Sequence, residues 1–405
     1  MSNSDGVANI NYTVFTVCNL AYLPKALVLA ESLAAFNHPK LKIFLFDKKI
    51  EGELPYDLAE FEWVEDLGLL NFSQYAFKYD ITEFSTSLKP WLTLKLLECN
   101  DKVIFLDPDI CLFSSLNPIL DLLDERDVIL TPHYITPHPE GDLGMMRFGS
   151  FNLGFFAVNS SYESSRFLRW WNERCLELCY FETQFGLSTD QKWVSIAPCF
   201  FPKLHISFDL GYNVAFWNVH ERVISVNPDG GYLVNNEYPL VFFHFSSFDE
   251  ENTELLSKRS FADRSTGRKD YIELADRYNS SLQRLKNKIS TTKYGFDFMS
   301  NGDYISPTLR RAYASVLKDL PCDHDPFDSN GVVADFAKKN HLVSDGSGYK
   351  PSGFGDVASN KSKFYLINKI MKLVLYALGP NRFMNFSRLL VYLSSFRLNR
   401  DMWKL

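Results

Sequence analysis

Two carboxylates, two residues apart, follow an apolar stretch of the sequence. Residues 102–107 are Lys-Val-Ile-Phe-Leu-Asp and predict a strand, and Pro108 and Asp109 come directly after it. A free strand end can turn Asp107 and Asp109 toward one cation, and carboxylate oxygens suit Mg²⁺ or Mn²⁺. Two such ligands leave positions open for diphosphate oxygens, so the cation would neutralise charge on a departing nucleotide diphosphate. The same spacing also suits a capped turn, which needs no metal.

His244 is the candidate for a third metal ligand. It lies within the apolar sequence Phe-Phe-His-Phe at 242–245. A lone histidine in an apolar strand is commonly a hydrogen-bonded core residue, but imidazole also binds Mn²⁺. Both interpretations of His244 stay open at this point.

The segment upstream of Asp107 predicts a nucleotide-binding sheet. A strand is expected at 12–18, a helix at 24–36 and a second strand at 41–46, which together form a βαβ unit with parallel strands. The carboxyl end of such a sheet is a common nucleotide site. We therefore expect an α/β domain over residues 10–250. Its other expected helices are 88–98, 162–178 and 189–197, and its other expected strands are 127–131, 151–158 and 240–245.

Composition excludes several classes of protein. The 405 residues are 46% hydrophobic and 22% charged, which excludes global disorder, and the net charge of −7 argues against a protein that coats nucleic acid. The seven cysteines are scattered and form no CxxC pair, as is typical of a reducing compartment. The first residues lack a secretory signal, and no apolar run reaches about 18 residues, so we expect a cytoplasmic protein.

The last part of the chain differs from the rest. Residues 251–360 predict polar helices and, over 320–362, loops; residues 361–405 form a separate tail. The tail holds nine Lys or Arg residues and one acidic residue, a net charge of 9 − 1 = +8, beside two apolar runs with helical spacing. Basic amphipathic helices on an acidic protein indicate contact with an anionic membrane surface. A helix pair packed on the domain, with its basic face in solvent, would have the same pattern.

Taken together, these residues resemble a known family. Residues 12–249 are similar to the GT-A-fold (Rossmann-like) nucleotide-diphospho-sugar transferases, nearest to the retaining glycosyltransferases of family 8, and within these to a bacterial branch that serves surface polysaccharide. In that family an Asn and a Tyr after the first strand meet the nucleoside. Here Asn19 and Tyr22 match them, with Thr16 and Cys18 at the strand end.

The resemblance also assigns the donor and metal sites. A basic residue ahead of the DxD motif contacts the donor in that family, and Lys89 matches it. A later FN-x-G strand lines the donor sugar, a DQ pair lies near the anomeric carbon, and a late His completes the metal site. The matching residues are Asn152 and Gly154, then Asp190 and Gln191, then His244. Each has an ordinary alternative: Asn152 could cap a turn, Asp190 could lie at a helix N-terminus, and Lys89 could be a surface lysine.

The sequence departs from the family in two places. A second acidic pair near the start is missing, which affects recognition of the base. The late His lacks the Gly and Lys-Pro-Trp that usually follow, so the diphosphate loses a lysine, and Lys258 is a candidate substitute. The glycine-containing loop between Thr131 and Phe151 is expected to close over the donor. The polar and aromatic residues His133, Arg147, Tyr212, Asn213, Trp217, His220 and Arg222 suit sugar stacking and ordinary packing equally.

The resemblance implies a metal-dependent glycosyltransferase that uses Mn²⁺ or Mg²⁺. It would transfer a sugar, with retention, from a nucleotide-sugar donor (a UDP-sugar) to a glycan or lipid-linked glycan acceptor. The enzyme would work at the cytoplasmic face of the inner membrane, in surface polysaccharide or lipopolysaccharide synthesis. The alternative is a non-catalytic nucleotide-sugar or glycan-binding module of the same fold. A nucleotidyltransferase would need a Gly-rich basic loop after the first strand, and the DxD spacing is wrong for the opposed carboxylates of a glycosidase.

Overall fold

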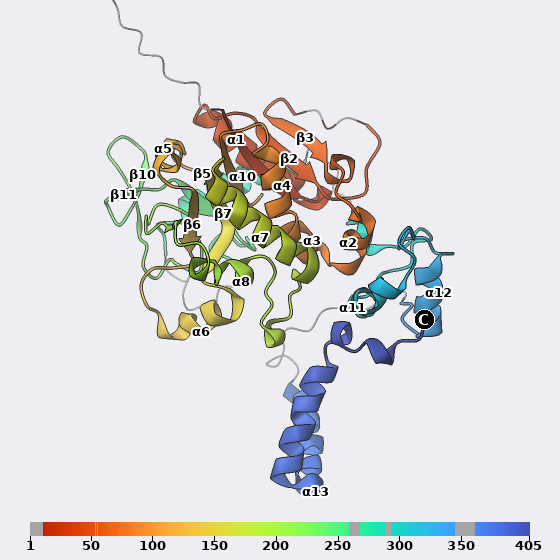
Figure 1. The fold of residues 1–405 in the computed structure, drawn as a ribbon. Coiled ribbons are helices and arrows are strands. Elements are labelled where there is room, and N and C mark those ends of the chain that lie inside the picture. The colour runs from red at the N-terminus through yellow and green to blue at the C-terminus, as the bar shows by residue number, and fades with distance from the viewer. Residues whose placement is uncertain (1–10, 53, 55, 259–267, 288–292, 345–360) are drawn as a thin grey trace, which may run out of the picture. The chain divides into compact units, whose positions relative to one another are not determined.

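The computed structural model describes residues 11–405 except 53, 55, 259–267, 288–292 and 345–360 (Figure 1). Its contacts divide the chain into two compact units. One comprises Met1–Leu70 and Ile81–Gly295, and the other comprises Asn71–Asp80 and Phe296–Leu405. The division into 10–250, 251–360 and 361–405 stays a prediction from composition.

The first unit is built on a seven-stranded mixed sheet with the order β3-β2-β1-β4-β7-β6-β8. β1 lies between β2 and β4 and is parallel to both, so the sheet starts parallel, as the βαβ pattern predicted. β7 is antiparallel to β4 and β6. The order reverses between β1 and β4, and the crevice at the carboxyl ends of two such strands is where ligands bind in open α/β sheets. The strands of this sheet are β1 (Tyr12–Cys18), β2 (Leu41–Leu45), β3 (Ala59–Trp63), β4 (Lys102–Leu106), β6 (Val128–Pro132), β7 (Phe151–Asn159) and β8 (Leu204–Ile206).

Both faces of the sheet are buried, which explains the continuous apolar run of β4. Ile104 and Leu106 face a core that includes α1, α5 and α10. Phe105 points to the other face and contacts Phe15 and Phe156; on that side Phe156 meets Trp171 of α7. Figure 1 shows α7 crossing this face, where it packs on α4. The helices of the first unit are α1 (Leu23–Ala35), α3 (Ile81–Ser87), α4 (Lys89–Leu96), α5 (Asn117–Glu125), α6 (Pro139–Phe148), α7 (Tyr162–Leu178), α8 (Gln191–Val194) and α10 (Ile272–Lys286).

Two small sheets complete the first unit. The short strand β5 follows the DxD motif directly and pairs antiparallel with β12, so that Ile110 lies opposite His244. A three-stranded sheet has the order β11-β10-β9. Their bounds are β5 (Ile110–Leu112), β9 (Ile224–Val226), β10 (Tyr232–Val234), β11 (Tyr238–Pro239) and β12 (Phe242–His244).

Several elements differ from the sequence expectations. The glycine-containing loop between Thr131 and Phe151 includes the helix α6, and α12 (Val332–Lys339) lies in a region expected to be loops. The strand β3, Ala-Glu-Phe-Glu-Trp, was not among the expected elements although its apolar and charged residues alternate; four of its five residues are not fully buried. Helix α10 packs against α1 inside the first unit, although its polar composition suggested a separate extension.

The second unit contains α2 (Phe72–Lys78), α11 (Pro307–Val316), α12 and α13 (Lys361–Leu393). Arg310 is 2% exposed, and its guanidinium donates to the carbonyls of Ala76, Phe77 and Tyr79 at the end of α2. It also donates to the Phe296 carbonyl and the Asp297 carboxylate. These bonds hold α2 and α11 together.

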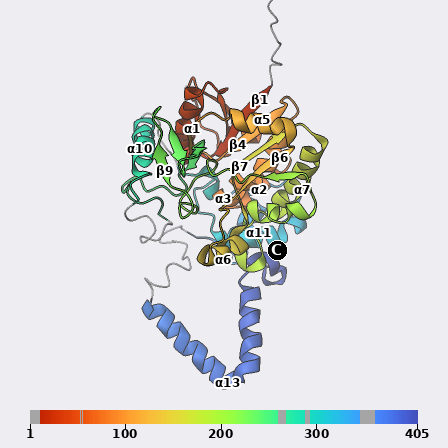
Figure 2. The same ribbon diagram turned by 90° about the vertical axis from the view of Figure 1, so that its left-hand side faces the viewer.

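Helix α13 consists of two arms, as Figure 2 shows. Gly379 separates them with φ of 75°, a conformation that glycine adopts without strain, and Pro380 begins the second arm. Large apolar side chains lie exposed along both arms; Leu373 is 71% exposed and Tyr376 is 92% exposed. Within the described part of the chain, no helix is both long and apolar enough to cross a membrane.

Candidate active site

The predicted metal ligands meet at the carboxyl end of β4. Asp107 follows β4, Asp109 precedes β5, and the β5–β12 pairing brings His244 beside them. Nε2 of His244 lies 3.0 Å from Asp109 Oδ1 and 3.8 Å from Asp107 Oδ2. One ligand atom from each of the three residues lies within 4.8 Å of the others. The DxD motif and a histidine 135 residues further along the chain therefore form one cluster.

The chemistry of this cluster fits a hard divalent cation. Asp109 and His244 are buried, and Asp107 is partly exposed. Burial by itself would raise the pKa of Asp109, but the adjacent His244 outweighs it and lowers the pKa to about 2, so Asp109 is ionised at neutral pH. Two carboxylates and one imidazole are donors that Mg²⁺ or Mn²⁺ accepts, and the exposed side of Asp107 leaves room for further ligands.

Lys89 is a buried cation between two carboxylates and not a surface lysine. It is 4% exposed, and its Nζ donates to the Leu153 carbonyl at 2.8 Å. The same Nζ lies 3.2 Å from Asp107 Oδ1 and 3.4 Å from Asp190 Oδ2. Burial disfavours its charge, but the two carboxylates outweigh burial and raise its pKa. Lys89 therefore links the metal cluster to the DQ pair.

Asp190 is held just ahead of α8. It is 2% exposed, its Oδ1 accepts from the Thr189 hydroxyl, and its backbone carbonyl accepts from the Trp171 indole. Its Oδ2 has no hydrogen-bond partner among the described residues beyond the long contact with Lys89. Burial raises the pKa of Asp190. A buried carboxylate oxygen without a hydrogen bond is costly, and a substrate hydroxyl could supply one.

Gln191 lies beside Asp190 but is engaged with α6. Its Nε2 donates to the Phe148 carbonyl at 2.9 Å, at the last residue of α6. Gly149, with φ of 126°, passes so close to α8 that a Cβ there would lie 3.1 Å from the Gln191 carbonyl. The segment expected to close over the donor thus contacts the residue assigned near the anomeric carbon.

The FN-x-G strand borders the metal cluster. The Asn152 carboxamide accepts from the Gly154 backbone N–H at 3.1 Å, and a Cβ at Gly154 would lie 2.4 Å from His244 Cε1. Asn213 contacts both Asn152 and His244. Asn213 was singled out in the sequence only as a residue that could stack or pack, because its partners come from distant strands.

The residues assigned to the nucleoside lie at the end of β1. Phe15 pairs with Phe105, so the stretch from Thr16 to Asn19 runs beside the approach to Asp107. Thr16, Cys18 and Asn19 are buried, and Thr16 Oγ1 has no hydrogen-bond partner among the described residues; Tyr22 is 41% exposed. Their roles stay predictions.

Lys25 is a cation near the metal cluster that sequence reasoning missed. Its Nζ lies over the Tyr22 ring, 4.4 Å from the centroid, and its charge acts to lower the pKa of Asp109. Lys258, the candidate substitute lysine, has a 60% exposed side chain whose Nζ lies 3.7 Å from Asp249. Lys25 at the start of α1 is thus a second candidate for contact with a diphosphate. In the sequence, nothing distinguishes Lys25 at the start of this helix from a surface lysine.

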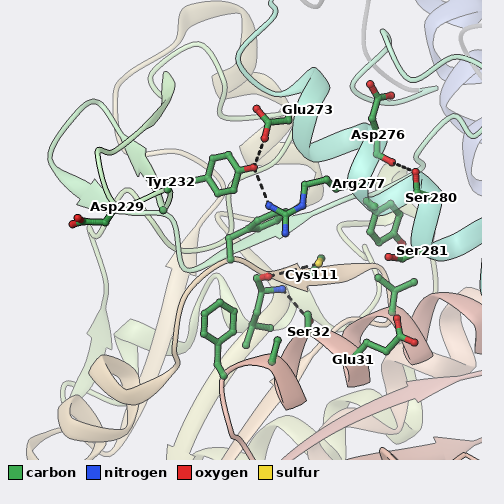
Figure 3. A pocket seen from close by; sticks show the side chains of 18 residues that line it. Glu31, Ser32, Cys111, Asp229, Tyr232, Glu273, Asp276, Arg277, Ser280 and Ser281 are labelled. Atoms are coloured by element: carbon green, nitrogen blue, oxygen red, sulfur yellow. Dashed lines mark hydrogen bonds between the residues drawn. The ribbon is translucent and has the colours of Figure 1, made fainter.

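A separate hollow of about 840 Å³ lies between α1, β5, α10 and the turn before β10 (Figure 3). In it the Tyr232 hydroxyl donates to Glu273 and accepts from Arg277. Cys111 and Ser32 also line the hollow. None of the predicted site residues lines this hollow.

Comparison with known proteins identifies the fold. Residues 56–179 match the family model described as nucleotide-diphospho-sugar transferase, and this segment contains Lys89, Asp107, Asp109, Asn152 and Gly154. Over residues 56–179 the chain is similar to the nucleotide-diphospho-sugar transferases. The predicted α/β fold with a helical C-terminal region is confirmed, and the match does not single out family 8.

Two curated relatives come from Bacillus subtilis (strain 168). YfnF is 27% identical over 176 residues, which cover 42% of this chain and 58% of YfnF. YfnD is 28% identical over 172 residues, 41% of this chain and 54% of YfnD. Both are described as uncharacterized, and the matched region spans little more than half the length of each.

Solved structures that are similar to this chain include two glycosyltransferases. The glycosyltransferase GlyE of Streptococcus pneumoniae TIGR4 is 18% identical and has a TM-score of 0.39 over 70% of this chain and 66% of its own. The galactosyltransferase LgtC, in complex with donor and acceptor sugar analogues, is 16% identical and has a TM-score of 0.39 over 69% and 97%.

Proposed function

We propose that this protein is a metal-dependent glycosyltransferase. It would move a sugar from a nucleotide-diphospho-sugar to a hydroxyl of a glycan or lipid-linked glycan in bacterial surface polysaccharide synthesis. The resemblance to the family implies that the donor is a UDP-sugar. The observation that carries the proposal is the cluster of Asp107, Asp109 and His244 at the point where the strand order reverses. The ion-paired Lys89 and Asp190 adjoin this cluster.

Each group of site residues has its own role in the proposed reaction. Asp107, Asp109 and His244 would hold Mn²⁺ or Mg²⁺, which neutralises charge on the leaving diphosphate when bound. Lys89 holds Asp107 and Asp190 in place and adds positive charge on the same side. Oδ2 of Asp190, which has no hydrogen bond among the described residues, would accept from a hydroxyl of the donor sugar. Asn152 and Gly154 would line the sugar, and Thr16, Cys18, Asn19 and Tyr22 would meet the nucleoside.

Retention of the anomeric configuration is part of the proposal. Asp190, which the resemblance assigns to the donor sugar, is already paired with Lys89. It is therefore poorly placed to serve as the free base that an inverting enzyme needs. In the proposed mechanism the departing phosphate takes the acceptor proton, while Gln191 lies at the anomeric carbon and α6 excludes water above it.

The acceptor would be presented at a membrane. The tail 361–405 has a net charge of +8, and the apolar side chains of α13 are exposed along both arms. A basic, apolar helix pair suits the anionic cytoplasmic leaflet of the inner membrane. This supports peripheral association of a cytoplasmic enzyme.

Vesicle flotation tests the membrane proposal. A variant with Leu366, Leu373 and Tyr376 changed to Ser should lose binding to phosphatidylglycerol vesicles, whereas Leu70→Ser, at a residue 81% exposed in the first unit, should bind as the wild type does. These substitutions preserve residues 395–405, which pack on the second unit through Arg400–Asp319 and the buried Trp403. Undiminished binding of the triple variant would refute the proposal.

The activity is tested with a panel of nucleotide sugars. Metal-dependent release of one nucleotide by the wild type, lost in Asp109→Ala and kept in Asp121→Ala, would establish the transfer and name the donor. Asp121 is an exposed carboxylate on α5 and serves as the matched control. Metal-dependent binding without turnover in the presence of acceptors would favour the alternative, a non-catalytic nucleotide-sugar or glycan-binding module. Absence of both would refute the proposal.

A further inference from the structure

A chain of hydrogen bonds joins the donor-sugar strand to the metal cluster through two asparagines. The Gly154 backbone N–H donates to Asn152 Oδ1 at 3.1 Å, and Asn213 Nδ2 donates to the same oxygen at 3.0 Å. Asn213 Oδ1 lies 3.2 Å from His244 Nδ1. The bonds run from β7, through the segment before β9, to the end of β12.

The direction of this chain follows from its first bond. A backbone N–H only donates, so the Asn152 atom that it meets is the carboxamide oxygen. That oxygen only accepts, so Asn213 must present its Nδ2 there and its Oδ1 to His244. Oδ1 only accepts, so Asn213 can take a hydrogen only from His244 Nδ1. Asp109 Oδ1 also only accepts and lies 3.0 Å from Nε2, so Asn213 and Asp109 compete for the hydrogen of a neutral, metal-free His244. A cation bound at Nε2, the nitrogen that faces Asp109 and Asp107, would take the Nε2 lone pair and leave the hydrogen on Nδ1, where Asn213 accepts it.

The other end of Asn152 has the same polarity. His133 Nδ1 lies 3.4 Å from the Ser150 carbonyl, which only accepts, so His133 carries its hydrogen on Nδ1. Its Nε2 is then an acceptor and lies 3.5 Å from Asn152 Nδ2. The Gly154 backbone N–H orients Asn152 directly, and the Ser150 carbonyl orients it through His133.

Asn213 is fixed in place. It is 1% exposed, and its backbone has φ of 53°, a left-handed conformation that asparagine adopts more readily than most residues. Its carbonyl accepts from Asn218 Nδ2, and its own Nδ2 also lies 3.2 Å from Thr131 Oγ1. Trp217 packs edge-on against the His244 ring, with centroids 5.1 Å apart.

We propose that Asn213 is a positioning residue that favours the Nδ1–H form of His244, the form that leaves Nε2 for the metal, and thereby couples the metal cluster to Asn152 in the donor-sugar pocket. The inference rests on the proposed metal-dependent function. Groups that orient a ligating histidine through its other nitrogen commonly change metal affinity 10–100-fold when removed. Because of this coupling, a substitution of Asn152 should affect His244, and a substitution of His244 should affect Asn152.

Two variants and one control separate positioning from packing. In Asn213→Leu the acceptor for Nδ1–H is lost, and we expect Mn²⁺ affinity by calorimetry to fall about 10–100-fold. In Asn213→Asp one carboxylate oxygen still accepts from Nδ1–H, so Mn²⁺ affinity is kept. The other oxygen meets the oxygen of Asn152, so the KM for the donor rises. Thr131→Val removes the other contact of the Asn213 amide and should leave Mn²⁺ affinity unchanged.

The tautomer itself is read by ¹⁵N NMR of histidine-labelled, metal-free protein at pH 9. The His244 signals, among eight histidines, are assigned by their loss in His244→Gln. Asn213 and Asp109 compete for the hydrogen, so Asn213→Leu should shift the tautomer population toward protonated Nε2 relative to the wild type, and Asn213→Asp should not. The same tautomer population in the wild type and Asn213→Leu, or wild-type Mn²⁺ affinity in Asn213→Leu, would overturn the inference. If Asn213→Leu does not fold, a loss of Mn²⁺ affinity in Asn213→Asp overturns it. A wild type that binds no metal would refute the proposed function, while the NMR result would still decide the tautomer.

Discussion

Replacement of Gly154 by alanine gives a sharp test of how the metal cluster is built. An added Cβ would lie 2.4 Å from His244 Cε1, 2.6 Å from His244 Nδ1 and 2.8 Å from Asn152 Oδ1. Carbon atoms pack at about 3.5–4.0 Å, so the imidazole and the strand must separate by roughly 1.1–1.6 Å. The change therefore acts on the metal ligand and on the asparagine chain together.

The expected loss is larger for metal binding than for stability. Overpacking at a buried position costs about 1–3 kcal/mol, and a folded protein remains. Metal–ligand distances tolerate only about 0.2 Å, so a shift of more than 1 Å removes His244 from the coordination sphere. We expect Mn²⁺ affinity to fall at least about 10-fold, which is the lower end for the loss of an orienting contact alone.

The assay pairs Mn²⁺ calorimetry with thermal unfolding of the same samples. Gly144→Ala is the matched control, because a Cβ at Gly144 in α6 meets nothing within 4 Å. It should bind Mn²⁺ as the wild type does, with unchanged or slightly raised stability. A folded Gly154→Ala protein with wild-type Mn²⁺ affinity would refute the assignment of His244 as a ligand held against β7.

Three further predictions concern charge and stability. Lys89→Met leaves Asp190 buried without its cation and should destabilise the fold by about 3–5 kcal/mol. The double variant Lys89→Met with Asp190→Asn should recover part of this, and a double variant no more stable than Lys89→Met would contradict the pairing seen here. Arg310→Lys keeps the charge but not the five hydrogen bonds of the guanidinium, and should lower the free energy of unfolding of the second unit by at least about 3 kcal/mol in denaturant titration. The pKa of Asp109 is lowered to about 2 against an unfolded value of about 3.9, so its stabilising contribution is present above that value and is lost as the pH falls toward 2. The free energy of unfolding of metal-free wild type should therefore fall more steeply between about pH 4 and pH 2 than that of Asp109→Asn. An equal pH dependence in the two proteins would count against the Asp109–His244 contact.

The sequence predicted the elements that carry the chemistry better than the contacts among them. β1, β4 and α7 lie where the apolar patterns placed them, because buried strands leave continuous apolar runs and a long helix leaves a periodic one. α6 was missed because its two glycines and its first residue, a proline, are typical of a loop, and α12 because it is short and lies among turn-forming residues. A polar exposed face dominates the composition of α10, and only a narrow stripe of it packs on α1.

The local sequence by itself determined that Asp107 and Asp109 follow a buried strand, since the strand pattern and the two carboxylates are adjacent in the chain. It also determined that the tail is basic. The tertiary structure decided which distant groups join them: His244 arrives through the β5–β12 pairing, Lys89 through the packing of α4 on the sheet, and Asn213 through the path of the segment before β9. Hydrogen bonds and ion pairs between residues that are distant in the chain depend on register and packing, and these follow from the whole fold and not from any local pattern. For this reason the direction of the Gly154–Asn152–Asn213–His244 chain is visible only in three dimensions.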